Sequence, residues 1–454
     1  MQLLILIIGF FYGLVQFNEV YVGLSFSIFF LLLYRILFKS NESFVFREWA
    51  LTLYSINYLI SPAVTYSLQE EQLFYGMKLS IDAYFNLAFY GFILFALGMF
   101  VIRTRIFQID NNKITNLALV NKEFLIRVSI LGIILRFIIP FLPGELGFFV
   151  YLFALIRFVG AFALMAVSRR LWYYSAIVLL IELFAAFIQG MYHDAIMWVI
   201  FFGLYYLYTV KPSIQIKLIG VSSTIFLIFF IQAIKFAYRE RVWQEGQEAS
   251  ISTVVEIGGQ QTNSEGLFST ANLLSTLNRG NQAWIFASTV DNMDRNKNFQ
   301  QFTNVNKYFE AALLPRFLAP NKLSSGDKEI FNKFSGHVIN ESTSMGLGVF
   351  ADGYIAFGTW GVYIFGFVLG LIFSLTFKIV ERWTKVSPFY VLLLLPLLNY
   401  AVRPDCELQT TINHLFKGIL VFGAIVYFTR KRFTLDSQEN QRKLLHLNLA
   451  TSKK

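Results

Sequence analysis

The chain has 454 residues and a composition that excludes an ordinary soluble domain. Hydrophobic residues make up 56% of it, aromatic residues 18% and charged residues only 15%, more apolar surface than a soluble globular protein of this length can bury. The net charge of +10 does not indicate nucleic-acid binding, because the basic residues lie in short loops between apolar runs. The single cysteine, Cys406, excludes an intramolecular disulfide and a cysteine-ligated metal cluster.

Apolar windows long enough to cross a bilayer recur along the whole chain. We therefore predict an all-α polytopic integral membrane protein with about 12 transmembrane helices of about 17–25 residues each. The first window starts at Met1 without a basic region or a small-residue cleavage site, which indicates a retained span rather than a signal peptide. The windows lie at about 2–17, 20–38, 49–68, 83–102, 124–142, 146–167, 171–188, 190–210, 215–237, 359–378, 388–402 and 410–429.

The distribution of lysine and arginine between these windows predicts the orientation of the chain. Every second loop is basic, and the alternation holds from one end of the chain to the other, so both termini are expected in the cytoplasm. The chain then divides into residues 1–237 with nine spans, one large extracytoplasmic loop at 238–358, residues 359–429 with three spans, and a basic cytoplasmic tail at 430–454.

The large loop has its own pattern. Residues Glu245 to Gln261 are rich in Gly, Gln, Ser and Glu, which indicates a mobile stretch. Ser264 could begin a helix that runs to Leu277. The sequence of residues 298–314 predicts another helix, which Pro315 interrupts.

The end of this loop combines a stiff basic stretch with a glycine-rich entry into the next span. Pro315 restricts the backbone next to Arg316. Gly353, Gly358 and Gly361 follow within a few residues, and they allow a close backbone approach or a break before the span.

Ionisable residues within or at the ends of the spans are costly and by default suggest function. One interpretation is that they pair with each other, for example Glu182 with Arg136 or Arg157. The other is that the excess of cations binds the phosphates of a lipid headgroup, for which the planar donor fork of arginine is suited. The set comprises Arg136, Arg157, Glu182, His193, Asp194, Lys235, Arg239, Arg241, Arg403, Asp405, Glu407 and His414.

Several motifs that would indicate other chemistry are missing from the sequence. It contains neither the phosphate-binding loop of nucleotide hydrolases nor a dinucleotide-binding glycine motif, so nucleotide-driven work is not expected. A zinc-binding His-Glu-x-x-His motif and a Gly-x-Ser-x-Gly nucleophile elbow are also missing. Any chemistry must therefore use a substrate that is already activated.

Two segments, "LLPRFLAPNK" and "ESTSMGLGVFADGYIAFGTWG", resemble the Pro-Arg…Lys and acidic-x-Tyr-x-x-Phe-Gly patterns of Wzy-type polymerases. These enzymes polymerise the repeat units of O-antigen and capsule. The resemblance extends to the many spans and to one large outer loop before the last helices. One departure is Gly190-Met-Tyr-His193 at the start of the eighth span, where members of the family often have Gly-Ser/Thr-Arg, so either His193 takes over a cationic role or this site differs.

The resemblance implies a glycosyltransferase of the cytoplasmic membrane. It would transfer a growing glycan from undecaprenyl pyrophosphate onto a new lipid-linked repeat unit at the outer face, and the product would be O-antigen, capsule or exopolysaccharide. The family suggests a chain-length regulator and a flippase as partners, and no cofactor is expected. The chemistry does not require a metal ion, although the sequence leaves a carboxylate-bound divalent ion open.

The resemblance also assigns roles to particular residues. As catalytic residues it implies Asp352 as the first candidate for the base, together with Arg316 and Arg279. Alternatives stay open, because Arg279 and Arg403 could form salt bridges with Asp291 and Asp405, Asp352 could cap a helix, and His337 could lie at the surface. The substrate-binding candidates are Arg239, Lys322, Arg403, His193, Glu407 and His337, of which Glu407 and His337 are also alternative bases.

Two other functions remain as rivals. An O-antigen ligase would have similar spans and arginines and would differ in its acceptor. A lipid-linked oligosaccharide flippase or another transporter would require repeated halves and helices that are discontinuous within the membrane, and the sequence contains no internal repeat.

Overall fold

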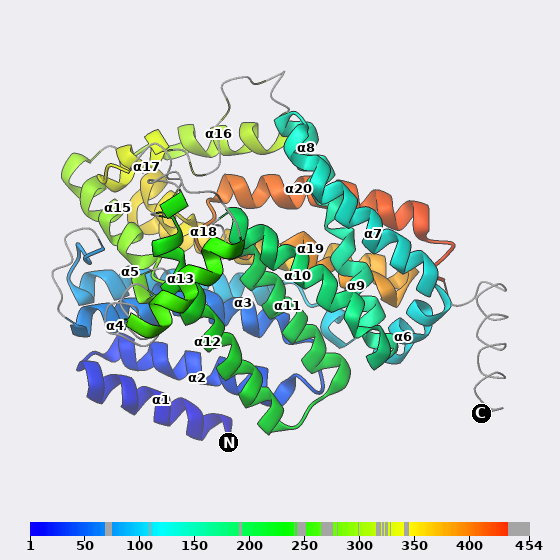
Figure 1. Cartoon of the computed structure of the whole chain (residues 1–454). Coiled ribbons are helices and arrows are strands. Elements are labelled where there is room, and N and C mark those ends of the chain that lie inside the picture. The colour runs from blue at the N-terminus through cyan, green and yellow to red at the C-terminus, as the bar shows by residue number, and fades with distance from the viewer. Residues whose placement is uncertain are drawn as a thin grey trace.

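The computed structural model covers the whole chain (Figure 1) and describes most of it. Every regular element in its described part is a helix, as the sequence predicts. The described residues are 1–68, 75–108, 110–189, 193–239, 241–242, 251–264, 276–278, 280–297, 299–314, 319, 322, 326, 328–339 and 345–434.

The helices up to the large loop are α1 (Gln2–Phe17), α2 (Val20–Lys39), α3 (Phe46–Ser55), the π-helical turn η1 (Ile56–Ile60), α4 (Ser61–Leu68), α5 (Ile81–Val101), η2 (Ile106–Gln108), α6 (Asn111–Val120), α7 (Lys122–Ile138), η3 (Ile139–Phe141), α8 (Gly144–Ala154), α9 (Ile156–Val167), η4 (Arg169–Leu171), α10 (Trp172–Gln189), α11 (His193–Val210) and α12 (Ile214–Arg239). The loop contains α13 (Ile251–Ser264), α15 (Ala283–Asn296), α16 (Gln301–Leu313) and α17 (Lys328–Ser335). The chain then continues through α18 (Val349–Val386), η6 (Pro388–Leu393), α19 (Leu394–Leu398) and α20 (Leu408–Thr429).

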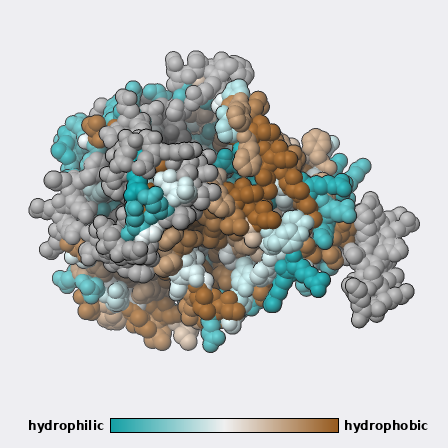
Figure 2. Space-filling model, in the orientation of Figure 1, coloured by the Kyte–Doolittle hydropathy of each residue, from teal (hydrophilic) through white to brown (hydrophobic). Residues whose placement is uncertain are grey.

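The apolar windows of the sequence coincide with one helix or with a run of consecutive helices, except that the window at 388–402 is helical only up to Leu398. In the described part, eight helices are long and apolar enough to cross a membrane, and two shorter apolar helices accompany them. The window at 49–68 is a continuous run of α3, η1 and α4. Figure 2 shows hydrophobic side chains gathered over the middle of one face, and the exposed side chains of Phe137 on α7 and Ile219 on α12 are of the kind that face lipid.

The large loop is more helical than the sequence suggests. The prediction of a mobile stretch from Glu245 to Gln261 is wrong for residues 251–261, which belong to α13. Ile257 of α13 packs against Ile234 and Tyr238 of α12, and this contact stabilises the helix. Ser264 ends α13 instead of beginning a helix, and residues 265–275 lie outside the described residues. The helix predicted at 298–314 is confirmed as α16.

Glycines let the two central helices, α5 and α18, approach each other closely. A side chain at Gly370 of α18 would clash with the backbone of Phe95 and Gly98 on α5, and one at Gly366 would clash with the carbonyl of Gly91. Membrane helices use small residues in this way because lipid provides no hydrophobic driving force for their association. This contact lies in the core of the molecule.

The predicted glycine break before the span is confirmed. Phe357 and Gly358 interrupt α18 with non-helical backbone angles, and Gly358 has a φ of 60° and a ψ of −142°, a region that is open to glycine alone. The backbone of Gly353 packs directly on that of Gly361. The short first part of α18, residues 349–356, is therefore folded back into the protein interior.

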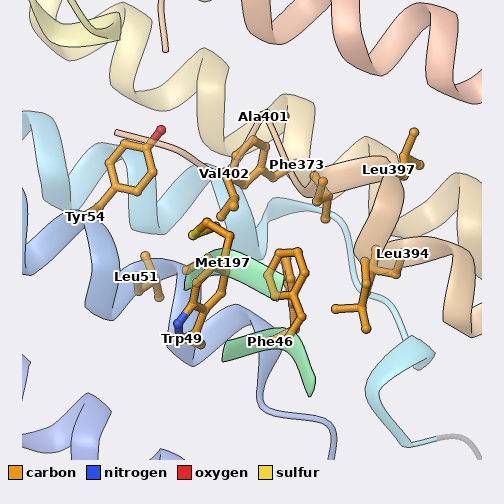
Figure 3. Packing of buried hydrophobic residues seen from close by; sticks show 14 of the residues in the cluster. Phe46, Trp49, Leu51, Tyr54, Met197, Phe373, Leu394, Leu397, Ala401 and Val402 are labelled. Atoms are coloured by element: carbon orange, nitrogen blue, oxygen red, sulfur yellow. The ribbon is translucent and has the colours of Figure 1, made fainter. Parts of the chain in front are cut away.

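The aromatic core joins the N-terminal helices to the last ones. In Figure 3, Phe46 and Trp49 of α3 lie beside Met197 of α11, with Leu394 of α19 close by. The rings of Trp49 and Phe201 pack edge to face with centroids 5.2 Å apart, a favoured geometry for aromatic pairs. This core supports the turn that follows α19.

Candidate functional site

The chain between α19 and α20, residues 399–407, forms a turn that we call the α19–α20 turn. Two tyrosines from the α3–η1 run hold it through its backbone. The hydroxyl of Tyr58 donates to the carbonyl of Pro404 at 3.0 Å, and that of Tyr54 lies 3.4 Å from the carbonyl of Arg403. Tyr84 of α5 in turn donates to the carbonyl of Tyr58 at 2.8 Å. Tyr58 lies within the π-helical turn, an element that is frequent at functional sites.

The segment before α18 covers this turn. Gly348 has a φ of 82°, and a side chain there would collide with the hydroxyl of Tyr58 and the carbonyl of Pro404. Gln282 at the start of α15 donates to the carbonyls of Gly346 and Leu347 at 2.9 and 3.2 Å. Position 348 therefore needs glycine, both for its positive φ angle and for its close contact with Tyr58 and Pro404.

Asp352 lies at the centre of these contacts and is only 2% exposed. Its Oδ2 accepts a hydrogen bond from the backbone N–H of Leu408 at 2.8 Å, and its Oδ1 accepts one from the hydroxyl of Tyr308 at 3.2 Å. Leu408 is the first residue of α20, so Asp352 caps a helix, as one interpretation of the sequence holds, although the helix is α20 and not its own.

Glu407, at the end of the turn, is a second buried carboxyl group with an exposure of 7%. Its Oε2 accepts hydrogen bonds from the backbone N–H of Gly326 at 3.3 Å and from the hydroxyl of Thr410 at 3.4 Å. Burial, followed by the charge of Asp352, raises the pKa of Glu407 to about 8. The contact with Gly326 places the large loop directly on the turn.

Arg403 is the cation of the turn. Its guanidinium binds Asp405 through two hydrogen bonds of 3.2 and 2.9 Å and donates to Asp194 of α11 at 3.3 Å. It also lies over the ring of Tyr400, 4.6 Å from the centroid. The predicted alternative of a salt bridge between Arg403 and Asp405 is thus confirmed. Partial burial raises the pKa of Asp405, but the charges of Arg403 and His193 outweigh it and hold that pKa at about 2.

The structure brings together several residues that the sequence placed in the site. Arg403 and Glu407 lie in one turn, Asp352 binds the backbone of Leu408 next to Glu407, and the charge of His193 lowers the pKa of Asp405. The side chain of Arg403 is 15% exposed, and those of its two carboxylate partners, Asp194 and Asp405, are more exposed, at 39% and 40%. This corner therefore combines a partly accessible cation with a buried carboxyl group.

A buried ion pair lies near this corner. Arg157 of α9 binds Glu182 of α10 at 2.6 Å, with 1% and 9% exposure of the two side chains, which confirms one of the two pairings considered from the sequence. Arg157 also donates to the carbonyl of Ala154 at 2.7 Å. Ala154 is the last residue of α8, and the break at Leu155 leaves its carbonyl without a hydrogen bond from the helix. The guanidinium of Arg157 supplies that hydrogen bond.

Two other predicted residues have partners outside the α19–α20 turn. The ammonium group of Lys322 donates to the carbonyl of Leu314 at 2.6 Å within the large loop. His337 lies 3.0 Å from the hydroxyl of Ser288 and packs edge to face on Trp284, so it is half-buried rather than at the surface. Burial lowers the pKa of His337, and the charge of Lys78 lowers it further.

Three predicted cations cannot be placed. Arg279 and Arg316 lie outside the described residues, as does the side chain of Arg239 at the end of α12. Among the described residues, no group of three or more histidine, cysteine, aspartate or glutamate side chains is placed to hold a metal ion.

Sequence reasoning missed the tyrosines of the site. Tyr58 and Tyr308 hold the turn and Asp352, and Tyr354 donates to Asp294 at 2.5 Å. With 23 tyrosines in the chain, no local pattern separates these from the aromatic residues that anchor helices at the membrane surface. The nearest signal is Tyr354, which stands within the acidic-x-Tyr pattern.

Comparison with known proteins gives one match. A family model described as "Domain of unknown function (DUF8712)" matches residues 52–385, a span that contains Tyr58 and Asp352 and ends before Arg403. No curated protein and no solved structure matches the chain. The family model covers more than half of the chain, which therefore belongs to the family of this domain of unknown function.

Proposed function

We propose that the protein is a membrane glycosyltransferase that polymerises oligosaccharide repeat units linked to undecaprenyl pyrophosphate. The product is a surface polysaccharide such as O-antigen, capsule or exopolysaccharide. Twelve spans cross the cytoplasmic membrane, both termini are cytoplasmic, and the loop at 238–358 lies at the outer face. The charge alternation of the short loops supports this orientation.

One observation carries the proposal. The α19–α20 turn presents a cation, Arg403, and a carboxyl group, Glu407, and the large loop reaches this turn through the hydrogen bond from Gly326 to Glu407. Arg316 and Lys322 precede Gly326 by at most ten residues in the chain. The loop can therefore bring further cations to the same corner, where a departing pyrophosphate needs them.

The proposed reaction needs few groups from the protein. The acceptor hydroxyl oxygen attacks the anomeric carbon of the donor sugar, and the bond from that carbon to the pyrophosphate oxygen breaks. The electrons stay on the leaving pyrophosphate, which Arg403, Arg316 and Arg279 stabilise. Glu407 takes the proton of the hydroxyl, because its pKa of about 8 lies near the working pH of a general base.

Asp352 has a different role in this proposal. Both of its oxygens are bonded, to Leu408 and Tyr308, and it is almost fully buried. A carboxylate in this position orients the turn and raises the pKa of Glu407 through its charge. We therefore assign Asp352 as a positioning residue and Glu407 as the base.

The proposal is tested by deleting the gene and resolving the surface glycan and the lipid-linked intermediates by gel and mass spectrometry. Polymerase function predicts single repeat units in place of polymer. Full-length polymer that stays on its lipid carrier would instead identify a ligase. Single units confined to the inner leaflet would identify a flippase.

A point variant then tests the site. Arg316→Ala should abolish chain extension while the protein stays in the membrane. Arg127→Ala is a matched control, since Arg127 is 80% exposed and pairs only loosely with Glu123 at 3.8 Å. Normal glycan length in a well-expressed Arg316→Ala variant would remove Arg316 from the site.

A second candidate function is that of a flippase or transporter, and the break between α8 and α9 is the observation that favours it. Such proteins use discontinuous helices and buried charges near the middle of the membrane. The break at Leu155, with Arg157 bonded to both Ala154 and Glu182, has these features. The location of single repeat units in the deletion strain separates this candidate from the polymerase.

A further inference from the structure

The last helix, α20, is followed by a short basic segment that packs against the start of α7. The carbonyl of Thr429, at the end of α20, accepts hydrogen bonds from the backbone N–H groups of Arg432 at 2.9 Å and Phe433 at 3.3 Å. The side-chain amide of Asn121, the residue before α7, donates to the carbonyl of Arg432 at 3.4 Å. We call Phe124 of α7 together with residues 427–433 the α7–α20 corner.

Phe433 fixes the corner in place. It is only 3% exposed, and its ring stacks on that of Phe389 with centroids 4.0 Å apart. The rings of Phe124 and Tyr390 also pack on it, each with its centroid 6.0 Å away. A buried aromatic ring with several ring neighbours is a strong anchor. The basic residues just before Phe433 are therefore held at a defined position on the protein.

Three consecutive cations, Arg430, Lys431 and Arg432, are exposed at this corner. The guanidinium of Arg432 lies over the ring of Phe124, 4.5 Å from the centroid, and that of Arg430 lies over the ring of Tyr427 at the same distance. Such a contact holds a guanidinium by attraction to the ring face and does not use its N–H donors. The aromatic rings therefore orient two arginine side chains at the surface.

The charges of the corner are almost all positive. Arg127 of α7 adds to the three cations after α20, whereas α7 contains a single carboxylate, that of Glu123. Glu123 lies 3.8 Å from Arg127, and no ion pair within the described part of the chain involves Arg430 or Lys431. An anion that reaches this corner therefore meets an excess of positive charge.

The same corner borders a surface of the kind that faces lipid. α7 and α20 are both long and apolar enough to cross a membrane, and the corner lies where one begins and the other ends. Just before the cations, Tyr427 and Phe428 are 59% and 80% exposed. Exposed aromatic residues next to exposed cations are typical of the place where a helix passes from the hydrocarbon into the headgroups. A ligand that fits both needs an anionic head and apolar chains.

We propose that the α7–α20 corner binds an anionic phospholipid. The oxygens of its phosphate accept hydrogen bonds from Arg430 and Arg432, because the planar donor fork of arginine matches a phosphate, and Lys431 adds a point charge. The acyl chains lie against Tyr427 and Phe428. The inference does not depend on the proposed enzymatic function, because it rests on the packing and the charge of this corner alone.

Lipid binding to the purified full chain, titrated in detergent and counted by native mass spectrometry, tests the proposal. The unchanged chain should bind phosphatidylglycerol, which is anionic, more tightly than zwitterionic phosphatidylethanolamine. The double variant Arg430→Ala and Arg432→Ala should bind phosphatidylglycerol about 10–30-fold more weakly, since each basic residue near an anionic lipid surface contributes about fivefold. Unchanged affinity in this variant would overturn the proposal.

The matched control is the double variant Arg169→Ala and Arg170→Ala. Both arginines are exposed and belong to η4, which joins α9 to α10. Their removal changes the net charge by the same amount as the first double variant. The control should bind phosphatidylglycerol as the unchanged chain does. An equal loss in both double variants would show that total charge alone governs binding, and it would overturn the site.

Two further outcomes overturn the proposal without any variant. Equal affinity of the unchanged chain for phosphatidylglycerol and phosphatidylethanolamine would remove the requirement for an anionic headgroup. Displacement of phosphatidylglycerol by inorganic phosphate at the same concentration would show that the corner binds a free anion. A lipid that is held by both its headgroup and its chains should resist this competition.

Discussion

The carboxylate of Asp352 and the backbone N–H of Leu408, 56 positions apart in the chain, are joined by a hydrogen bond of 2.8 Å. Through this bond a residue in the first turn of α18 caps α20. The second oxygen of Asp352 binds Tyr308 of α16, so one side chain ties together two apolar helices and a helix of the large loop. This relationship makes the site a product of tertiary packing rather than of one motif.

The capping role of Asp352 can be measured. Asp352→Ala removes the acceptor of the Leu408 N–H and one acceptor of the Tyr308 hydroxyl. We expect a loss of about 1–3 kcal/mol in the free energy of unfolding. Asp352→Asn keeps an oxygen for Leu408 and should lose less, as measured by thermal unfolding of the solubilised protein.

The same two variants separate a positioning role from catalysis. Asp352→Asn should retain glycan polymerisation, since its amide can still bind both neighbours. A variant with normal stability and no polymer would instead make Asp352 the base, as the resemblance implies.

Glu407 should control how the reaction depends on pH. Burial and the charge of Asp352 raise its pKa to about 8, and a general base acts only when it is deprotonated. The polymerisation rate of the purified protein on lipid-linked repeat units should therefore rise with pH up to about 8 and then level off. Glu407→Gln should be slow at every pH, whereas the exposed Glu42→Gln should behave like the unchanged chain.

The raised pKa also predicts the pH dependence of stability. From an ordinary value of 4.5 up to about 8, the folded carboxyl group of Glu407 keeps a proton that the unfolded chain has released. The stabilisation from this group is complete below pH 4.5 and is lost as the pH rises through about 8. Glu407→Gln should flatten this part of the stability profile, and an unchanged profile would contradict the assignment.

The pair of Arg157 and Glu182 gives a test of buried charge. Arg157→Ala leaves Glu182 as a buried charge without its partner, and we expect it to cost about 3–5 kcal/mol of stability. The double substitution Arg157→Met and Glu182→Leu removes both charges and should restore most of this loss. The exposed pair of Arg127 and Glu123 serves as the control, since its removal should cost no more than about 1 kcal/mol. A double variant as unstable as Arg157→Ala would show that the bond to Ala154 dominates.

The helices of this fold could be predicted from the sequence because the membrane imposes their length and apolar character. The apolar windows coincide with helices, apart from the end of the window at 388–402, and the break near Gly358 follows from the special backbone angles that glycine permits. The helix at 251–264 could not be predicted, because its stability comes from packing on α12 rather than from its own polar sequence.

The candidate site was predictable only in part, for a related reason. Arg403 and Glu407 were identifiable as costly charges at the end of a span. The hydrogen-bond partners of these two residues could not be predicted, because Asp194 and Gly326 are distant in sequence and reach the turn only when the helices pack. The roles of Tyr58 and Tyr308 depend on the same packing, which a single sequence does not display.

The close packing of α5 and α18 gives a final prediction. A side chain at Gly370 would collide with the backbone of Phe95, Met99 and Gly98, and backbone on both sides cannot move aside as a flexible side chain can. Gly370→Val should therefore prevent the two helices from packing, and little folded protein should reach the membrane. Gly220→Val on α12 is a matched control, since no atom lies near its new side chain. Membrane-fraction immunoblots and size-exclusion profiles compare the two variants. Equal amounts of folded protein would contradict the close approach, because an apolar side chain added within the membrane is harmful only where another helix already occupies its space.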